Sequence, residues 1–375
     1  MKNIAVITWK FDNYGTILQA YALNHYLNQN VKNVKCKLVN YELEKKNLDI
    51  PFRYFSLSLP HKVAIKVQQA FKILRGKDGA IAEEVIKRRD LFEEFAEQIP
   101  QTKPLSKNEL KELNNDFDIF ICGSDQIWNP NYFDKSYLLD FVSTGKKIAY
   151  APSFGGKKIP FRLKNEYRKC LKSFACLSTR EPSSCEIIEA ITNRKCPYVV
   201  DPTLLLSKEQ WINALNIKKN TQEKYILCYF LSDNLWYKKV VSQIKEHLKL
   251  PVIFIAPSRK VVEGKLIYPG PKEFVQLVNN AEYVITDSFH GTVFSVIMEK
   301  QFITLQRFSG KNGNNENARL IAFLKIIGCL ERFVGKENCE LIDLDRIEFC
   351  RVQCAIGTEI EKSKKYLDEA INLKK

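Results

Sequence analysis

Two stretches decide the fold of this chain, Asp118-Ile-Phe-Ile-Cys-Gly-Ser-Asp125 and Tyr283-Val-Ile-Thr-Asp-Ser-Phe-His-Gly291. Each is a short apolar run that ends in small and polar residues. Such a run is typical of a buried parallel strand, and ligands bind beyond the carboxyl ends of parallel strands. The repetition therefore indicates two similar α/β halves, and two such halves facing each other would enclose a cleft.

The rest of the chain alternates short apolar runs with longer amphipathic segments, which is the α/β pattern. In the first half, strands are expected at residues 4–8, 37–41, 119–122, 148–150, 175–178 and 198–200, with helices such as 16–28 and 81–96. In the second half, strands are expected at 225–231, 252–256, 283–286 and 302–305, and a helix with one apolar stripe at 356–373.

The chain has 375 residues, which predicts about two domains at roughly 150 residues each. A turn at Asp201-Pro-Thr203 separates the two series of strands. We place an N-terminal α/β domain at residues 1–205 and a C-terminal one at 206–345. A C-terminal helical segment is expected at 346–375.

The composition, 45% hydrophobic and 27% charged, is that of a globular protein. No apolar run approaches the ~20 residues of a membrane helix, and the apolar run at 4–9 is too short for a signal peptide.

The eleven cysteines include no C-x-x-C pair. Several of them, such as Cys122 and Cys228, lie in apolar runs and are typical of buried thiols in a reducing compartment. No histidine accompanies Cys350 and Cys354, so no metal is expected. These features predict a cytoplasmic protein.

The net charge of +15 predicts an acidic partner, either nucleic acid, anionic lipid or a phosphorylated or carboxylated substrate, unless it only solubilises the surface. No nucleic-acid-binding motif accompanies the charge, so no nucleic acid is expected. Residues 51–77 are basic, contain no acid and carry an apolar helical stripe. They predict peripheral contact with an anionic membrane, or a helix packed on its own domain.

The strongest candidate site is Thr286-Asp-Ser-Phe-His-Gly-Thr292, which precedes an apolar helix at 293–298. A helix start offers free N–H groups and partial positive charge to an anion. His290 is the candidate acid–base or phosphate contact there. The alternative is that Asp287 or Ser288 only caps the helix. Further candidate substrate contacts are Ser288, Gly291 and Thr292.

The second candidate site is Cys122-Gly-Ser-Asp-Gln-Ile-Trp-Asn-Pro130. Asp125 provides a carboxylate at a strand end, where amides can bond sugar hydroxyls and an indole can stack on a sugar. The alternative is a capped helix with a buried Trp128. The candidate contacts with substrate are Gly123, Ser124, Gln126, Trp128 and Asn129.

A third candidate is the glycine-bearing loop Lys10-Phe-Asp-Asn-Tyr-Gly-Thr-Ile-Leu-Gln-Ala20, which follows the first strand. It lacks both the G-x-G-x-x-G fingerprint and the P-loop pattern, so neither a dinucleotide nor a P-loop phosphate site is expected. Asn13 alone as a helix cap is the alternative. The candidate contacts are Asn13, Tyr14, Gly15, Thr16 and Gln19.

Three arginines are candidates to bind an anion. Arg180, in Ser178-Thr-Arg-Glu181, closes an expected strand and suits a bidentate grip on carboxylate or phosphate. The alternative is a salt bridge from Arg180 to Glu181 or Asp201. Arg307 and Arg319 lie downstream of His290 and are weaker candidates for the same ligand.

Five of these motifs, in this order, resemble the polysaccharide pyruvyl transferases over roughly residues 3 to 335. They are the stretches beginning at Asn13 (Asn-Tyr-Gly-Thr-Ile-Leu-Gln), Gly123 (Gly-Ser-Asp-Gln-Ile-Trp-Asn), Ser178 (Ser-Thr-Arg-Glu), Asp201 (Asp-Pro-Thr) and Thr286 (Thr-Asp-Ser-Phe-His-Gly). The resemblance implies a GT-B-like fold, in which two Rossmann-like domains with parallel sheets face each other across a cleft. The N-terminal domain is then expected on the acceptor side. Many members have Gly-Asp where this chain has Gly15-Thr16, so no catalytic carboxylate is assigned there.

The resemblance also implies transfer of the enolpyruvyl unit of phosphoenolpyruvate to two hydroxyls of a sugar, which forms a ketal and releases phosphate. Such enzymes act in bacterial capsule, exopolysaccharide or cell-wall synthesis, often on a lipid-linked sugar. The expected catalytic residues are His290, Asp125 and Arg180. No cofactor is expected besides phosphoenolpyruvate as donor. Two other hypotheses remain: a GT-B glycosyltransferase with a nucleotide-sugar donor, and a non-catalytic protein that binds anionic surfaces.

Overall fold

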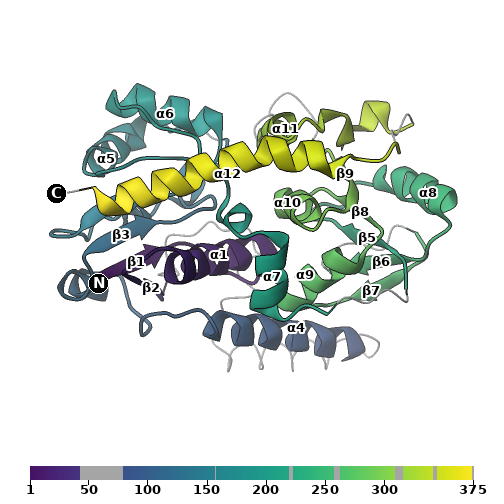
Figure 1. The fold of residues 1–375 in the computed structure, drawn as a ribbon, viewed down its shortest axis with the longest axis horizontal. Helices are drawn as coiled ribbons and strands as arrows, with labels where there is room; N and C mark the ends of the chain where they lie inside the picture. The colour runs from purple at the N-terminus through teal and green to yellow at the C-terminus, as the bar shows by residue number, and fades with distance from the viewer. Residues whose placement is uncertain are drawn as a thin grey trace.

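Two parallel sheets lie side by side, each flanked by helices (Figure 1). The computed structural model describes residues 1–42, 79–156, 158–218, 223–256, 262–308, 316–340 and 344–373. The basic segment 51–77 lies outside these residues. The two sheets confirm the predicted α/β class with two Rossmann-like halves.

The first sheet has four parallel strands in the order β2-β1-β3-β4. They are β1 (Lys2–Ile7), β2 (Val34–Leu38), β3 (Ile119–Cys122) and β4 (Lys146–Ala149). The central pairing aligns Ile4 with Ile119 and, on the other side, with Cys36. All residues of β3 are buried, as expected for a strand that is covered on both faces.

The second sheet has six parallel strands in the order β10-β9-β8-β5-β6-β7. They are β5 (Ile226–Tyr229), β6 (Val252–Ile255), β7 (Lys265–Ile267), β8 (Tyr283–Thr286), β9 (Gln301–Leu305) and β10 (Phe333–Val334). The two edge strands, β7 and β10, are not predicted by the sequence because both are short and β7 is largely exposed.

Three expected strands of the first half are wrong or displaced. The strand expected at 37–41 is β2, which lies earlier in the chain and alternates exposed and buried residues. The segments 175–178 and 198–200 form only single bridges, Ile148 to Cys176 and Thr179 to Tyr198. One reason is that the Ser178 hydroxyl donates to the Ala149 carbonyl at 2.7 Å, so a side chain takes an acceptor of the neighbouring strand.

Side chains cap the N-termini of the helices that begin at the cleft. Asn13 starts α1 (Tyr14–Asn30) by accepting from the N–H groups of Gly15 and Thr16, and Ser288 starts α10 (Phe289–Ile297). The other α-helices are α4 (Gly79–Glu97), α5 (Phe161–Lys172), α6 (Pro182–Thr192), α7 (Lys208–Leu215), α8 (Tyr237–Leu248), α9 (Pro271–Asn280), α11 (Glu316–Ile326) and α12 (Phe349–Asn372). Short 3₁₀ helices include η2 (Pro130–Tyr132) and η4 (Pro202–Leu205).

Helix α1 joins the two halves through aromatic packing. The Tyr14 ring stacks on Phe274 of α9 at 4.5 Å between ring centroids, and the Tyr14 hydroxyl donates to the Pro269 carbonyl at 2.7 Å. Trp211 of α7 packs between Tyr21 and Phe294. One hydrophobic cluster therefore runs through both halves.

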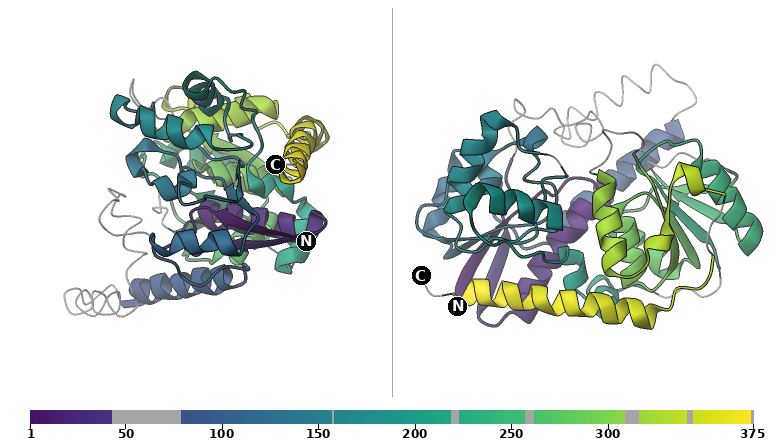
Figure 2. Two further views of the ribbon diagram at one scale, coloured as in Figure 1. Left: turned by 90° about the vertical axis from the view of Figure 1, so that its left-hand side faces the viewer. Right: turned by 90° about the horizontal axis from the view of Figure 1, so that it is seen from above.

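The last helix, α12, lies across both halves (Figures 1 and 2). Near its start, the Gln353 amide donates to the Val296 carbonyl of the second half. Further along, Ser363 accepts from the Val200 N–H at 2.9 Å and the Tyr366 hydroxyl donates to the Ala149 carbonyl at 2.8 Å. The expected C-terminal helix is confirmed, but it begins already at Phe349.

No helix in the described ranges combines the length and the apolar character that a membrane span requires. The eleven cysteines are all free thiols; Cys122 and Cys228 are buried as expected, whereas Cys350 and Cys354 are exposed on α12.

Candidate active site

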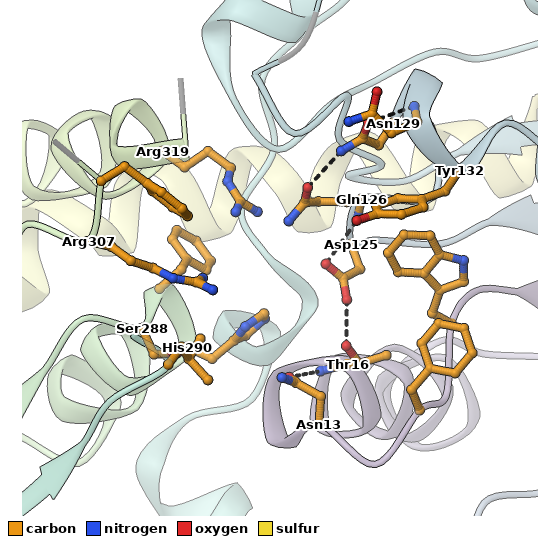
Figure 3. A pocket seen from close by; sticks show the side chains of 16 residues that line it. Asn13, Thr16, Asp125, Gln126, Asn129, Tyr132, Ser288, His290, Arg307 and Arg319 are labelled. Atoms are coloured by element: carbon orange, nitrogen blue, oxygen red, sulfur yellow. Dashed lines mark hydrogen bonds between the residues drawn. The ribbon is translucent and has the colours of Figure 1, made fainter. Parts of the chain in front are cut away.

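A cavity of about 300 Å³ lies where the carboxyl ends of the two sheets face each other (Figure 3). Residues after β1 and β3 line one wall, and residues after β5, β8 and β9, together with α11, line the other. The lining residues are Trp9, Phe11, Asn13, Thr16, Asp125, Gln126, Asn129, Asn131, Tyr132, Leu231, Ser288, Phe289, His290, Arg307, Phe308 and Arg319.

His290 lies in the first turn of α10 and lines the cavity with 8% of its surface exposed. Its Nε2 atom lies 3.4 Å from Oδ2 of Asp201. Its Nδ1 atom faces α1, where a Cβ added to Gly15 would lie 1.9 Å away. Gly15 is therefore needed to admit the imidazole, which is a different role from the substrate contact that the sequence predicts.

Ser288, rather than Asp287, caps α10. The Ser288 hydroxyl accepts from the Gly291 N–H at 3.3 Å, and Ser288 also lines the cavity. The Asp287 carboxylate instead accepts from the N–H groups of Leu231 at 2.6 Å and Ser232 at 2.9 Å. Burial raises the pKa of Asp287. Asp287 thus holds the loop after β5 against the start of α10.

Asp201 connects His290 to Arg180. It is 1% exposed, and its Oδ2 atom accepts from Nη1 of Arg180 at 2.5 Å and from the Ser124 hydroxyl at 3.2 Å. Burial alone would raise the pKa of this carboxyl, but His290 and Arg180 outweigh burial and hold it well below its usual range. Asp201 is therefore ionised across the physiological pH range.

Arg180 does not line the cavity and forms the salt bridge that was the alternative to a substrate contact. Its Nη2 atom lies 3.5 Å from Oδ1 of Asp125, and its guanidinium lies 4.9 Å over the Phe289 ring. Burial opposes its charge, but Asp201, Asp125 and Glu181 raise the pKa of the guanidinium. Arg180 thus links the carboxylates of the two loops that the sequence treats as separate motifs.

Asp125 points into the cavity from the end of β3 (Figure 3). Its Oδ2 atom accepts from the Thr16 hydroxyl at 2.7 Å, and its Oδ1 atom accepts from the Gln126 N–H at 2.8 Å. The backbone of Asp125 has φ +72°, a left-handed conformation that is uncommon outside glycine. Such residues concentrate at functional sites.

Arg307 and Arg319 line the opposite wall, as Figure 3 shows. Arg307 follows β9 and lies 4.9 Å over the Phe308 ring, whereas Arg319 comes from α11 and lies 6.0 Å from the Phe289 ring. Both are half-buried. The two weaker arginine candidates of the sequence thus reach the cavity, which Arg180 does not.

Several predicted contacts are buried away from the cavity. The Trp128 indole donates to the Tyr137 carbonyl and is 1% exposed, so it does not stack on a ligand. The Gln19 amide bonds Thr8, Trp9 and Thr16, and the Thr292 hydroxyl bonds Thr304 and the Ser288 carbonyl. Gly123 and Gly291 pack against Thr8 and Thr286, and Tyr14 packs in the core between the halves.

Sequence reasoning missed the aromatic part of the cavity wall. Trp9 packs against Phe11 at 5.5 Å and against Tyr132 at 5.6 Å between ring centroids. Trp9 and Phe11 lie in or beside the loop after β1, and Tyr132 ends η2. No local pattern marks these rings because they meet only after the chain folds. Asp201 belongs to the Asp-Pro-Thr motif, which is typical of a turn. The sequence therefore does not indicate its role beside His290.

Two Rossmann-like halves with parallel sheets around a polar cavity define a GT-B-like fold. S. aureus MnaA solved with UDP is similar in fold, with a TM-score of 0.52, 12% identity and coverage of 100% of this chain and 98% of that one. A UDP-N-acetylglucosamine 2-epimerase gives a TM-score of 0.53, 12% identity and coverage of 99% and 95%. At these identities the likeness shows the fold alone.

The family follows from the sequence profile of polysaccharide pyruvyl transferases, which matches residues 13–307. The chain belongs to this family, a family of transferases. No curated protein matches the chain in sequence.

Proposed function

We propose that this protein transfers the pyruvyl unit of phosphoenolpyruvate to two hydroxyls of a sugar, forming a pyruvate ketal and releasing phosphate. The observation that carries the proposal is the separation of charge across the cavity. Arg307, Arg319 and His290 line one wall, and the Asp125 carboxylate lies on the other. Such a cavity suits one anionic and one hydroxyl-bearing substrate.

The cationic wall suits the donor. Phosphoenolpyruvate carries a carboxylate and a phosphate, and arginine binds both groups through paired N–H donors. The start of α10 adds its helix dipole at Ser288 and His290, which line the same wall. Arg307 and Arg319 therefore replace Arg180 as the proposed donor contacts.

The other wall suits a sugar. Asp125 can accept a hydroxyl proton or a hydrogen bond, and the Gln126 and Asn129 amides lie beside it. The exposed parts of Trp9 and Tyr132 offer aromatic surface to the apolar face of a sugar ring. We propose that the acceptor is a sugar of a polysaccharide or lipid-linked intermediate, bound on this wall.

The proposed reaction starts with a proton added to the methylene carbon of phosphoenolpyruvate, which makes its neighbour an oxocarbenium-like carbon. One sugar hydroxyl adds to that carbon, the carbon–phosphate oxygen bond breaks, and the second hydroxyl closes the ketal. The two sugar hydroxyls give up two protons. One replaces the proton that was added to the methylene carbon, and the other leaves with the phosphate. The step therefore needs one acid and one base, each worth about 10²–10⁴-fold.

We assign the acid to His290 and the base to Asp125. Asp201 is a positioning residue, because its carboxylate faces Nε2 of His290 and holds Arg180. Thr16 and Arg180 hold the Asp125 carboxylate from two sides.

The test is incubation of the purified protein with phosphoenolpyruvate and a panel of sugars and lipid-linked sugars. We expect release of phosphate together with the mass gain of one pyruvate ketal on the acceptor. Phosphoenolpyruvate at 100 times its dissociation constant should add about 2.7 kcal/mol of stability. That stabilisation should be lost in the Arg307→Ala/Arg319→Ala variant.

Lys238→Ala/Lys239→Ala on α8 is the matched control, since it removes two exposed cations that do not line the cavity. It should keep the stabilisation. Stabilisation by a nucleotide sugar but not by phosphoenolpyruvate, with transfer of its sugar, would replace this proposal with glycosyl transfer.

A further inference from the structure

Helix α5 presents an outer face on which the exposed charges are mostly positive. The one acid from 158 to 172 is Glu166, whose side chain is 41% exposed. On the helix, the exposed side chains fall within about 160° of arc at 100° per residue. The opposite face buries Tyr167, Cys170 and Leu171. The exposed cations of this region are Lys158, Arg162, Lys164, Lys169 and Lys172.

These five cations keep their charge unpaired. In the described ranges, none of them lies within salt-bridge distance of a carboxylate, whereas the one acid of α5, Glu166, pairs with Lys135 at 2.5 Å. The neighbouring helix α6 exposes Glu186 and Glu189, so the single-sign surface is confined to α5 and Lys158. Clustered like charges repel one another in the folded protein, and a cationic surface attracts an anionic partner.

One aromatic side chain stands at the end of this face. Phe161, the first residue of α5, is 93% exposed, more than any other large hydrophobic side chain in the described ranges. A cluster of cations attracts an anionic bilayer, and an exposed aromatic side chain beside it can enter the headgroup region. Single-stranded nucleic acid instead needs a groove that follows its backbone, and the outer face of a helix is convex.

The buried face of α5 packs toward the cavity. The Tyr167 hydroxyl donates to the Trp128 carbonyl at 2.8 Å, in the loop that continues to Asn129 of the cavity wall. In the segment that leads into α5, a Cβ on Gly155 would lie 2.3 Å from Oε1 of Gln126, another lining residue. The outer face of α5 therefore lies on the side of the helix away from the cavity wall.

We propose that the outer face of α5 docks this protein on an anionic lipid bilayer, with the five cations at the headgroups and Phe161 inserted between them. This surface includes none of residues 51–77. The proposal does not depend on the reaction, because it rests on the charge, exposure and shape of α5 alone. A lipid-linked acceptor would be held at the same bilayer.

The test is sedimentation of the full chain with phosphatidylcholine vesicles, with and without phosphatidylserine. We expect binding that requires phosphatidylserine and weakens with salt. Arg162→Gln/Lys164→Gln/Lys169→Gln should lower the partition coefficient about a hundredfold, at roughly a tenfold loss or less for each cation. Phe161→Ser should remove the part of the binding that persists at high salt.

The control is Lys362→Gln/Lys364→Gln/Lys365→Gln on α12, which removes the same charge from lysines that pair with Glu359, Glu361 and Glu369. It should bind vesicles like the wild type. All variants should unfold at the wild-type temperature, since the altered side chains are on the surface. Equal binding by the α5 variant and the control would overturn the proposal. So would a wild-type protein that binds no vesicles, whether or not it binds nucleic acid.

Discussion

Gly15 and His290 occupy the same space at the start of α1. A Cβ at Gly15 would lie 1.9 Å from Nδ1 of His290, so the imidazole of Gly15→Ala must move. We expect turnover to fall at least about tenfold while the fold is kept, because alanine favours a helix by roughly 1 kcal/mol over glycine. Kinetics and thermal unfolding measure the two effects.

Gly357→Ala on α12 is the control, since no heavy atom lies within 4 Å of its added Cβ. It should leave turnover unchanged. Wild-type turnover in Gly15→Ala would show that the position of His290 does not matter.

The buried Asp201 makes a second prediction at the residue scale. Its pKa is held below the unfolded value, so it stabilises the fold above about pH 4, and that stability is lost as pH falls through the native pKa. Asp201→Asn should cost about 3–5 kcal/mol at neutral pH, because it leaves Arg180 buried without its carboxylate. Chemical denaturation at several pH values measures both effects. A variant as stable as the wild type at pH 7 would contradict the assignment.

Asp12 is expected to behave in the opposite way. Burial raises its pKa to about 6, although Arg88 and Arg89 oppose the shift. The native state then keeps the carboxyl proton of Asp12, which the unfolded chain releases near pH 4. The contribution of Asp12 to the free energy of unfolding therefore falls as pH rises from about 4 to 6. Through Asp12, the wild type should lose about 2 kcal/mol of unfolding free energy over this pH range, and Asp12→Asn should not show that loss. Unfolding free energies at pH 4 and 7 test this, and an unchanged difference between them would refute it.

At the scale of elements, the last helix ties the two halves together. Ser363 is 1% exposed and accepts from the buried Val200 N–H at 2.9 Å. Ser363→Ala should destabilise the protein by about 1–3 kcal/mol, because that N–H loses its partner. Lys362→Ala, next to it but exposed and paired only with Glu359, should change stability by less than about 0.5 kcal/mol. Equal effects in urea denaturation would mean that α12 does not depend on the Ser363 contact.

At the scale of the whole molecule, a continuous hydrophobic cluster couples the halves. Tyr14 of α1 stacks on Phe274 of α9, which is fully buried. We expect one unfolding transition for both halves. Phe274→Ala should lower the free energy of unfolding by about 3–5 kcal/mol and separate the halves. Calorimetry tests both points, and two transitions in the wild type would show that the halves unfold independently.

The sequence by itself determined the central strands of both sheets and the loops that meet at the cleft. Strands such as β3 and β8 are predictable because an apolar run followed by small polar residues is a local pattern. Each of these loops lies at the carboxyl edge of its own sheet, and the two sheets face each other, which brings Asp125 and His290 to one cleft. The strands expected at 175–178 and 198–200 do not form because side chains such as that of Ser178 take backbone partners.

Only the tertiary structure decided which side of each loop faces the cavity. Trp128 and Arg180 turn inward to bond the Tyr137 carbonyl and Asp201, whereas Trp9 and Tyr132 form a wall together. These contacts join residues distant in the chain, and their energies depend on burial and on charges from other loops. No local pattern contains that information, because it exists only once the two sheets face each other.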